Sequence, residues 1–216
     1  MYSTVLFDLD GTLTDPGLGI TNSVAYALER YAIEVKDRSS LYCFIGPPLN
    51  DSFMKYYGFT PEKAMEAISV YREYFRDKGI FENEVYEGIP ALLEKIRLTG
   101  RKIVLATSKP EEFALRILEH FDLMKYFDVV TGASMDEKRN KKGDVIKYAL
   151  EKGGFSAQDC IMIGDREHDI FGAKENALSS IGVLYGYGSR DELEKAGADY
   201  IAETVEDIFK VLEGIR

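Results

Sequence analysis

The chain has 216 residues, of which 45% are hydrophobic and 30% charged, and its formal net charge is −10 at pH 7. This length and composition fit one soluble globular domain, or one domain with an insertion, and exclude a largely disordered chain. The acidic excess is unfavourable for binding nucleic acid or an anionic membrane, and no apolar run reaches the roughly 18 residues of a membrane span. We therefore expect neither nucleic acid nor membrane as a partner.

Cysteine and histidine content narrows the chemistry further. The two cysteines, Cys43 and Cys160, lie far apart without CxxC spacing, which favours reduced thiols and a cytoplasmic location. No signal peptide is expected, because Asp8 interrupts the short apolar run near the N-terminus. With only His120 and His168, a histidine-rich zinc site is not expected, and a metal would be a hard cation held by carboxylates.

The first predicted element is a strand. Residues 4–7 form a short apolar run rich in strand formers, and the Asp-Leu-Asp-Gly-Thr sequence at residues 8–12 ends it. This pattern indicates a buried strand that runs into a polar turn.

The pattern changes over residues 16–87. Apolar residues such as Val24 and Leu28 recur there at helical spacing, and no strand is expected in this stretch. Thr60 followed by Pro61 is typical of a helix start, with Thr60 as the N-cap. We expect an inserted, all-helical domain over 16–87 that moves as a lid.

Strands and helices alternate after Arg101. The strands are expected at residues 103–106, 127–130, 160–163, 180–184 and 200–202. Apolar strands separated by helices indicate a mainly parallel sheet covered on both faces. The sequence therefore predicts an α/β fold: a Rossmann-like, three-layer α/β/α core made of residues 1–15 and 88–216.

Polar segments follow several of these strands, where open parallel sheets bind ligands. Asp8 and Asp10 are two residues apart, and Gly11 permits the turn that brings both into one pocket. Thr107 has a hydroxyl that can donate to a phosphate oxygen, although a threonine there is more often a cap or turn residue. The lysine-rich stretch at residues 138–142 is mainly a solvated face, from which one lysine can point inward.

The last polar segment contains Asp165 and Asp169. A helix that begins between them would turn both carboxylates toward the sheet, although a plain turn residue and N-cap remain the alternative. With Asp8 and Asp10, four acids would then meet at one edge. Two like charges 5 Å apart repel by about 3 kcal/mol at an effective dielectric near 20, so four need a cation. Oxygen ligands of this kind suit Mg²⁺.

Together these segments resemble the four motifs of the haloacid dehalogenase-like hydrolase superfamily. The resemblance covers essentially the whole chain, and the helical insertion looks like the family's type-1 cap. Within the superfamily the chain is most similar to phosphoglycolate phosphatase-like proteins, some of whose close relatives are 5′-nucleotidases. The resemblance implies a Mg²⁺-dependent phosphatase that hydrolyses a small phosphate monoester through an aspartyl-phosphate intermediate.

The resemblance also implies roles for individual residues. Asp8 matches the nucleophile, Asp10 the general acid/base, and Thr107 the hydroxyl that binds the phosphoryl group. Lys142 matches the lysine that steadies the negative charge, with Lys141 as the alternative because the register is ambiguous there.

The implied magnesium ligands are the side chains of Asp8 and Asp165, the backbone carbonyl of Asp10, and Asp169, which would bind directly or through water or another residue. Substrate-binding candidates are Ser108 and Gly46, whose backbone N–H could approach a ligand closely; a loop without ligand contact is the alternative for Gly46.

The sequence leaves several functions open. The acid at position 10 favours a phosphatase over a dehalogenase, and the expected partner is a small phosphorylated metabolite. The alternatives are a 5′-nucleotidase, a sugar phosphomutase with the same motifs, and a phosphate-binding protein that has lost catalysis. We expect a monomer or a homodimer.

Overall fold

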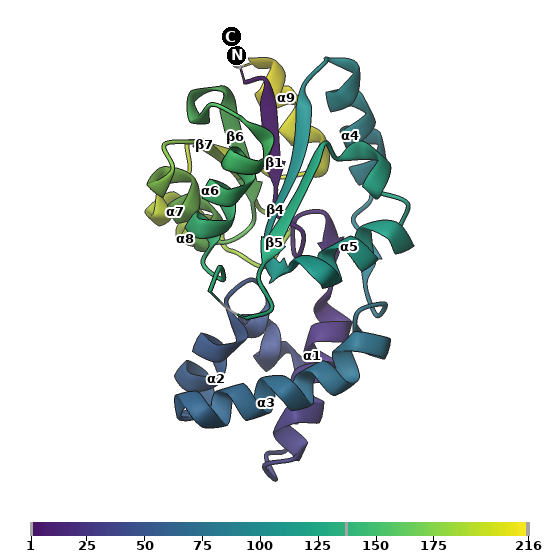
Figure 1. Cartoon of the computed structure of the whole chain (residues 1–216), viewed down its shortest axis with the longest axis vertical. Coiled ribbons are helices and arrows are strands. Elements are labelled where there is room, and N and C mark those ends of the chain that lie inside the picture. The colour runs from purple at the N-terminus through teal and green to yellow at the C-terminus, as the bar shows by residue number, and fades with distance from the viewer. Residues whose placement is uncertain (1, 137, 215–216) are drawn as a thin grey trace. The chain divides into compact units, whose positions relative to one another are not determined.

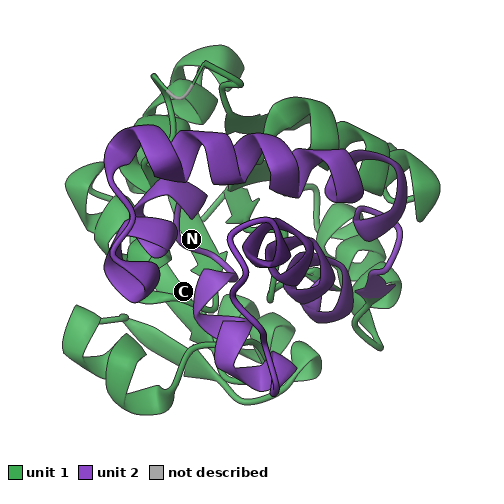
Figure 2. Ribbon diagram, turned by 90° about the horizontal axis from the view of Figure 1, so that it is seen from below, with its two compact units in different colours: residues 1–14, 85–216 green, residues 15–84 purple. Residues whose placement is uncertain are grey.

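The computed structural model describes residues 2–136 and 138–214 of the chain. The chain divides into two compact units, coloured separately in Figure 2. Unit 1 comprises Met1–Thr14 and Val85–Arg216, and unit 2 comprises Asp15–Glu84. Two short strands, β2 (Thr14–Asp15) and β3 (Glu84–Val85), span the two points at which the chain passes from one unit to the other.

Unit 1 is built on a six-stranded sheet in the order β5-β4-β1-β6-β7-β8, in which all neighbouring strands are parallel. The strands are β1 (Thr4–Phe7), β4 (Lys102–Pro110), β5 (Val129–Ala133), β6 (Cys160–Gly164), β7 (Ser179–Val183) and β8 (Tyr200–Ala202). Every residue of β1 and β6 is buried, which explains why these strands are apolar except for Thr4.

Helices cover both faces of this sheet. Figure 1 shows α6 (Lys142–Gly153), α7 (Glu167–Glu175) and α8 (Arg190–Ala196) on one side, and α4 (Ile89–Leu98), α5 (Glu111–His120) and α9 (Val205–Gly214) on the other. On the first side, Leu6 and Met162 of the sheet pack with Val145 and Ile146 of α6 in a fully buried cluster. The predicted three-layer α/β/α core is therefore confirmed.

Several boundaries of the sequence-based prediction are wrong: the strand expected at 103–106 runs over Lys102–Pro110, and the one expected at 180–184 over Ser179–Val183. The strand expected at 127–130 begins at Val129 and continues to Ala133, because Phe127 instead closes the 3₁₀ turn Met124–Tyr126 by donating its N–H to the Met124 carbonyl. The stretch expected to lack strands contains Glu84–Val85, which pairs with β2 in a two-stranded sheet.

Unit 2 is helical and has an aromatic core of its own. Its elements are α1 (Gly17–Glu29), the 3₁₀ helix Arg38–Phe44, α2 (Leu49–Tyr57), α3 (Pro61–Tyr74) and the π-helical turn Phe75–Gly79. The rings of Phe44 and Phe53 meet edge to face with centroids 5.0 Å apart, a favourable arrangement. The predicted start of α3 is confirmed, since Thr60 Oγ1 accepts a hydrogen bond from Lys63 N and Pro61 occupies the first turn.

No helix of the described residues combines the length and the apolar character needed to cross a membrane.

Candidate active site

The site begins where β1 and β6, adjacent in the sheet, come to an end. Phe7 is in register with Ile163, and Asp8 donates its backbone N–H to the Ile163 carbonyl at 2.9 Å. Asp8 and Asp165 consequently leave the sheet side by side, each one or two residues beyond the last paired position. This placement at the carboxyl ends of parallel strands is what the sequence pattern predicted.

Gly11 makes the turn after β1 possible for two reasons. Its φ of 82° lies in the left-handed region that favours glycine. A Cβ at this position would also lie 2.2 Å from Asp165 Oδ2, far inside van der Waals contact. The glycine thus lets the β1 turn approach the Asp165 carboxylate.

Three carboxylates converge at this edge. Asp8, Asp165 and Asp169 each offer an oxygen within 4.8 Å of the other two, and all three residues are buried. Asp169 is not an N-cap but the third residue of α7, and its Oδ2 accepts the Arg166 backbone N–H at 3.0 Å. The helix start therefore fixes one Asp169 oxygen and leaves the other in the cluster.

Lys142 is the lysine that enters this cluster. Its Nζ lies 2.7 Å from Asp8 Oδ1 and 2.8 Å from Asp169 Oδ1, and it donates to the Ala106 carbonyl at 3.0 Å. Although burial opposes the charged form, the carboxylates of Asp169 and Asp8 raise the pKa of Lys142 above its usual value. Lys141 is exposed at the N-cap of α6, so of the two lysines it is Lys142 that contacts these carboxylates.

The carboxylates are held where ionisation is unfavourable. Burial raises the pKa of Asp165 well above its usual value, and the charges of Asp169 and Asp8 add to the shift. Burial also raises the pKa of Asp169, against the opposing charge of Lys142. A nearby cation favours the ionised form of a carboxylate, so this environment suits a metal ion.

Asp10 lies outside the three-carboxylate group and pairs with a residue to which the sequence assigned no role. Its Oδ2 is 2.7 Å from Lys109 Nζ, and both side chains are buried. Burial raises the pKa of Asp10, while the Lys109 charge acts in the opposite direction. The sequence offered one signal, a lysine two residues after Thr107 at the end of a strand.

The phosphate-binding candidates of β4 lie at the same edge of the sheet. Thr107 is buried, and its Oγ1 accepts the backbone N–H of Lys109 at 3.2 Å. Ser108 is half-buried next to it. Gly46 belongs to unit 2, where its φ of 100° lies in the left-handed region. Substrate binding by Ser108 and Gly46 stays a prediction.

A loop after β7 completes the surroundings of Asp165, and sequence reasoning missed it. Tyr187 donates its backbone N–H to Asp165 Oδ2 at 2.8 Å, and the Tyr185 hydroxyl donates to the Thr12 carbonyl at 2.8 Å. A Cβ on Gly188 would lie 1.8 Å from the Asp165 carbonyl oxygen. The only sequence signal was the Gly-Tyr-Gly pattern just beyond a strand.

The described residues fit a divalent cation. The donor set is all oxygen, from buried carboxylates, and such ligands suit Mg²⁺. Within the group of Asp8, Asp165 and Asp169, Lys142 supplies one positive charge against three carboxylates. A divalent cation would balance the two remaining negative charges.

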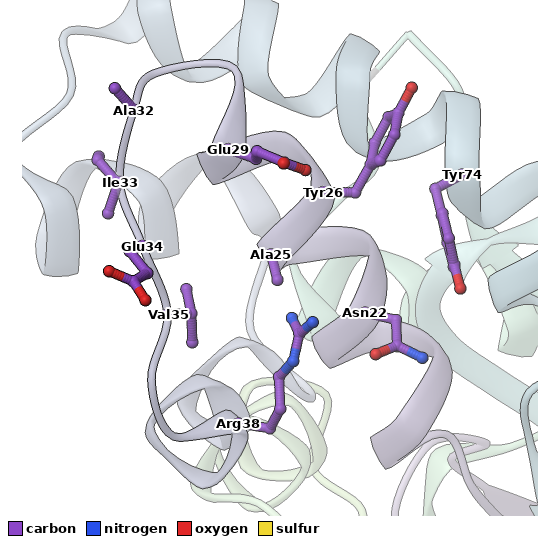
Figure 3. Close-up of a pocket in the computed structure, with 10 residues that line it drawn as sticks. All are labelled: Asn22, Ala25, Tyr26, Glu29, Ala32, Ile33, Glu34, Val35, Arg38 and Tyr74. Carbon is purple, nitrogen blue, oxygen red and sulfur yellow. The ribbon is translucent and has the colours of Figure 1, made fainter.

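Unit 2 contains a separate pocket of about 600 Å³, shown in Figure 3. Residues of α1 and the segment that follows it form most of its lining, including Tyr26, Glu29 and Arg38. Arg38 Nη1 donates to the Thr21 carbonyl at 3.1 Å, so this guanidinium helps to hold the wall of the pocket. None of the predicted site residues lines it.

Comparison with known proteins assigns this chain to a family. Residues 5–183 match the family model for haloacid dehalogenase-like hydrolases. The chain is 45% identical over 212 residues to a 5′-nucleotidase of Pseudomonas aeruginosa, with 98% of this chain and 96% of that protein covered. It is 36% identical over 210 residues to the tyrosine-protein kinase PtkA of Mycobacterium tuberculosis, with 96% of this chain and 72% of that protein covered.

The solved structures agree. A predicted phosphatase from Clostridium acetobutylicum superposes with a TM-score of 0.97 at 54% identity, with 99% of each chain covered. As its four motifs predicted, the chain belongs to the haloacid dehalogenase-like hydrolase family, and it is an enzyme of the phosphatase type.

Proposed function

We propose that this phosphatase is Mg²⁺-dependent and hydrolyses a small phosphate monoester through an aspartyl-phosphate intermediate on Asp8. The observation that carries the proposal is the buried group of Asp8, Asp165 and Asp169, whose ligand oxygens lie within 4.8 Å of one another, with Lys142 paired to two of them. A nucleophilic carboxylate that meets a phosphate dianion needs positive charge beside it, which Lys142 supplies in part and a bound cation would complete.

The metal would be held by the side chains of Asp8, Asp165 and Asp169 and by the backbone carbonyl of Asp10. When bound, it supplies charge neutralisation and orients the phosphate. Lys142 contributes a second, permanent positive charge between Asp8 and Asp169. Thr107 places a buried hydroxyl at the end of β4 for a phosphoryl oxygen.

The first step forms the bond between an Asp8 carboxylate oxygen and phosphorus and breaks the bond between phosphorus and the leaving-group oxygen. Protonated Asp10 gives its proton to that oxygen, so an alcohol departs. In the second step Asp10 takes a proton from water while the water oxygen attacks phosphorus. The bond from Asp8 to phosphorus breaks, inorganic phosphate leaves, and both carboxyl groups return to their starting states.

Two substrate classes follow. A small monoester such as phosphoglycolate agrees with the motif pattern. A nucleoside 5′-monophosphate is the second candidate, and the 45% identity to a 5′-nucleotidase supports it. A sugar phosphomutase shares the same motifs and is the least favoured alternative.

We further propose that unit 2 acts as the cap that excludes water during transfer, with Gly46 near the leaving group. The proposed setting is the cytoplasm, with a monomer or a homodimer as the active species.

The test is a phosphate-release screen in Mg²⁺ and in EDTA, over a panel that includes phosphoglycolate, nucleoside monophosphates and hexose phosphates. We expect Mg²⁺-dependent release from one class, and none from Asp8→Asn that is folded by circular dichroism. Release by Asp8→Asn at the wild-type rate would reject the mechanism. Conversion of a hexose 1-phosphate to its isomer, with a bisphosphate primer and no inorganic phosphate, would identify a mutase.

A further inference from the structure

Lys109 is a buried, positively charged residue that has no role in the proposed reaction steps. Its side chain is only 4% exposed, and its Nζ lies 2.7 Å from Asp10 Oδ2, on a side chain that is 11% exposed. Burying a lysine is unfavourable unless the charge is paired, so the pair with Asp10 accounts for its presence there.

The backbone conformation of β4 sets the direction of the Lys109 side chain. In the pairing of β4 with β5, Thr107 is in register with Gly132, and Pro110 with the very next residue, Ala133. Ser108 and Lys109 are therefore extra residues in a bulge, a device that re-aims side chains beside active sites. The bulge is fixed locally, because Lys109 N donates to Thr107 Oγ1 at 3.2 Å and a Cβ on Gly132 would lie 2.6 Å from the Lys109 carbonyl oxygen.

The two oxygens of Asp10 are consequently different. Oδ2 faces the Lys109 ammonium group, whereas Oδ1 is buried and makes no hydrogen bond to any residue that the structure describes. A buried carboxylate oxygen normally has a partner, and its lack of one within the protein suits a group that meets its partner in the substrate.

We propose that Lys109 is a positioning residue: it holds Asp10 Oδ2 so that Oδ1 exchanges the proton with the leaving-group oxygen. This inference rests on the proposed role of Asp10 as general acid/base. It goes beyond that role because it assigns the two oxygens of Asp10 and names the residue that keeps them distinct.

The inference predicts a dependence on the leaving group. An alkoxide needs a proton as it departs, whereas a nitrophenolate leaves without one. Since kcat/KM reports the step that forms the aspartyl phosphate, loss of the positioned acid should lower it for an alkyl phosphate far more than for p-nitrophenyl phosphate. A defect in general folding would lower both alike.

The experiment compares β-glycerophosphate with p-nitrophenyl phosphate, both with Mg²⁺. We expect Lys109→Met to lower kcat/KM about 100-fold for the first and less than about threefold for the second, as loss of a positioned acid implies. Lys109→Arg keeps the charge and should restore most of the loss. Lys102→Met is the matched control, since Lys102 lies on the same strand and pairs with Asp128 at the same 2.7 Å distance, but with a side chain that is 58% exposed.

A double variant tests whether Lys109 acts through Asp10. With Asp10→Asn already present, Lys109→Met should change kcat/KM for β-glycerophosphate by less than about twofold, because two residues that act as a unit are not additive. This variant carries neither charge, so it remains informative if Lys109→Met alone does not fold. A further drop as large as in the wild-type background would overturn the inference.

Failure of this inference and failure of the proposed mechanism give different results. Equal losses for both substrates in Lys109→Met, with a selective loss in Asp10→Asn, overturn the inference alone. Equal losses in Asp10→Asn overturn the acid/base role of Asp10, and with it the proposed mechanism.

Discussion

Lys142 Nζ and Asp8 Oδ1 are 2.7 Å apart, and the two side chains are 3% and 5% exposed. The ammonium group also reaches Asp169, so a single lysine links the end of β1 to the start of α7. The pair thus contributes both to the charge of the site and to its stability.

Lys142→Met should lower both activity and stability. Loss of one preorganised positive group costs about 10²- to 10³-fold in kcat, and removing one partner of a buried pair costs about 3–5 kcal/mol in the free energy of unfolding. The measurements are phosphate release and urea unfolding. Lys147→Met, on the exposed face of the same helix, is the control and should leave both unchanged. Wild-type kcat in Lys142→Met would contradict the role given to this lysine.

Mg²⁺ should stabilise the protein in the absence of substrate. Binding to the folded state alone adds about 2.7 kcal/mol at 100 times the dissociation constant, which thermal unfolding with and without Mg²⁺ detects. Asp165→Asn should remove this shift, because Asp165 is one of the three grouped carboxylates. Asp159→Asn, an exposed acid just before β6, should retain it. An undiminished shift in Asp165→Asn would argue against a metal at this site.

Gly11→Ala should be more harmful than Gly100→Ala. Both glycines have nearly the same φ, 82° and 81°, in the left-handed region, where a residue with a Cβ costs about 1–2 kcal/mol. A Cβ at Gly100 meets nothing within 4 Å, whereas one at Gly11 would meet the Asp165 carboxylate. We expect only Gly11→Ala to lose the Mg²⁺-induced shift in thermal unfolding. Equal behaviour of the two variants would mean that the close approach to Asp165 has no consequence.

The Cys160 thiol should be unreactive at neutral pH. Burial raises its pKa to about 11, so iodoacetamide at pH 8 should label Cys43, which is half-buried, well before Cys160. Mass spectrometry of the labelled peptides checks this order. Faster labelling of Cys160 than of Cys43 in the folded protein would contradict it.

The same pKa gives a signed dependence of stability on pH. The pKa of Cys160 in the folded protein lies above the unfolded value of 9.0, so folding favours the protonated thiol. This contribution to the free energy of unfolding is complete below about pH 9 and is lost as the pH rises through about 11. Urea unfolding between pH 8 and 11 should show wild type losing stability relative to Cys160→Ala. Parallel curves for the two proteins would show that the thiol does not titrate as expected.

The sequence predicted much of the site because its acids follow strand ends, where topology alone brings them together. Asp8 and Asp165 needed only a parallel sheet with β1 beside β6. The partner of Asp10 could not be predicted, because the aim of Lys109 depends on a bulge that shifts the register of β4. The hydrogen bond from the Tyr187 backbone N–H to Asp165 could not be predicted either, since every residue except proline carries a backbone N–H.

The boundaries that sequence reasoning missed have a similar cause. Phe127 is as apolar as a strand residue, but its backbone is used by the preceding 3₁₀ turn. The strand Glu84–Val85 has only two residues, too few to give a periodic pattern, so it could be identified only from the structure.

The sheet of unit 1 also bears on synthesis in the cell. Of the strands in this sheet, β1 is synthesised first. Phe7 can pair on one side only after Leu105 has been synthesised, and on the other side only after Ile163. Unit 2 is one uninterrupted stretch, Asp15–Glu84, which can gain its structure while the ribosome is still translating the rest. A nascent chain stopped before β6 can pair β1 with β4 but is expected to leave the other edge of this apolar strand unpaired, a feature that chaperones recognise.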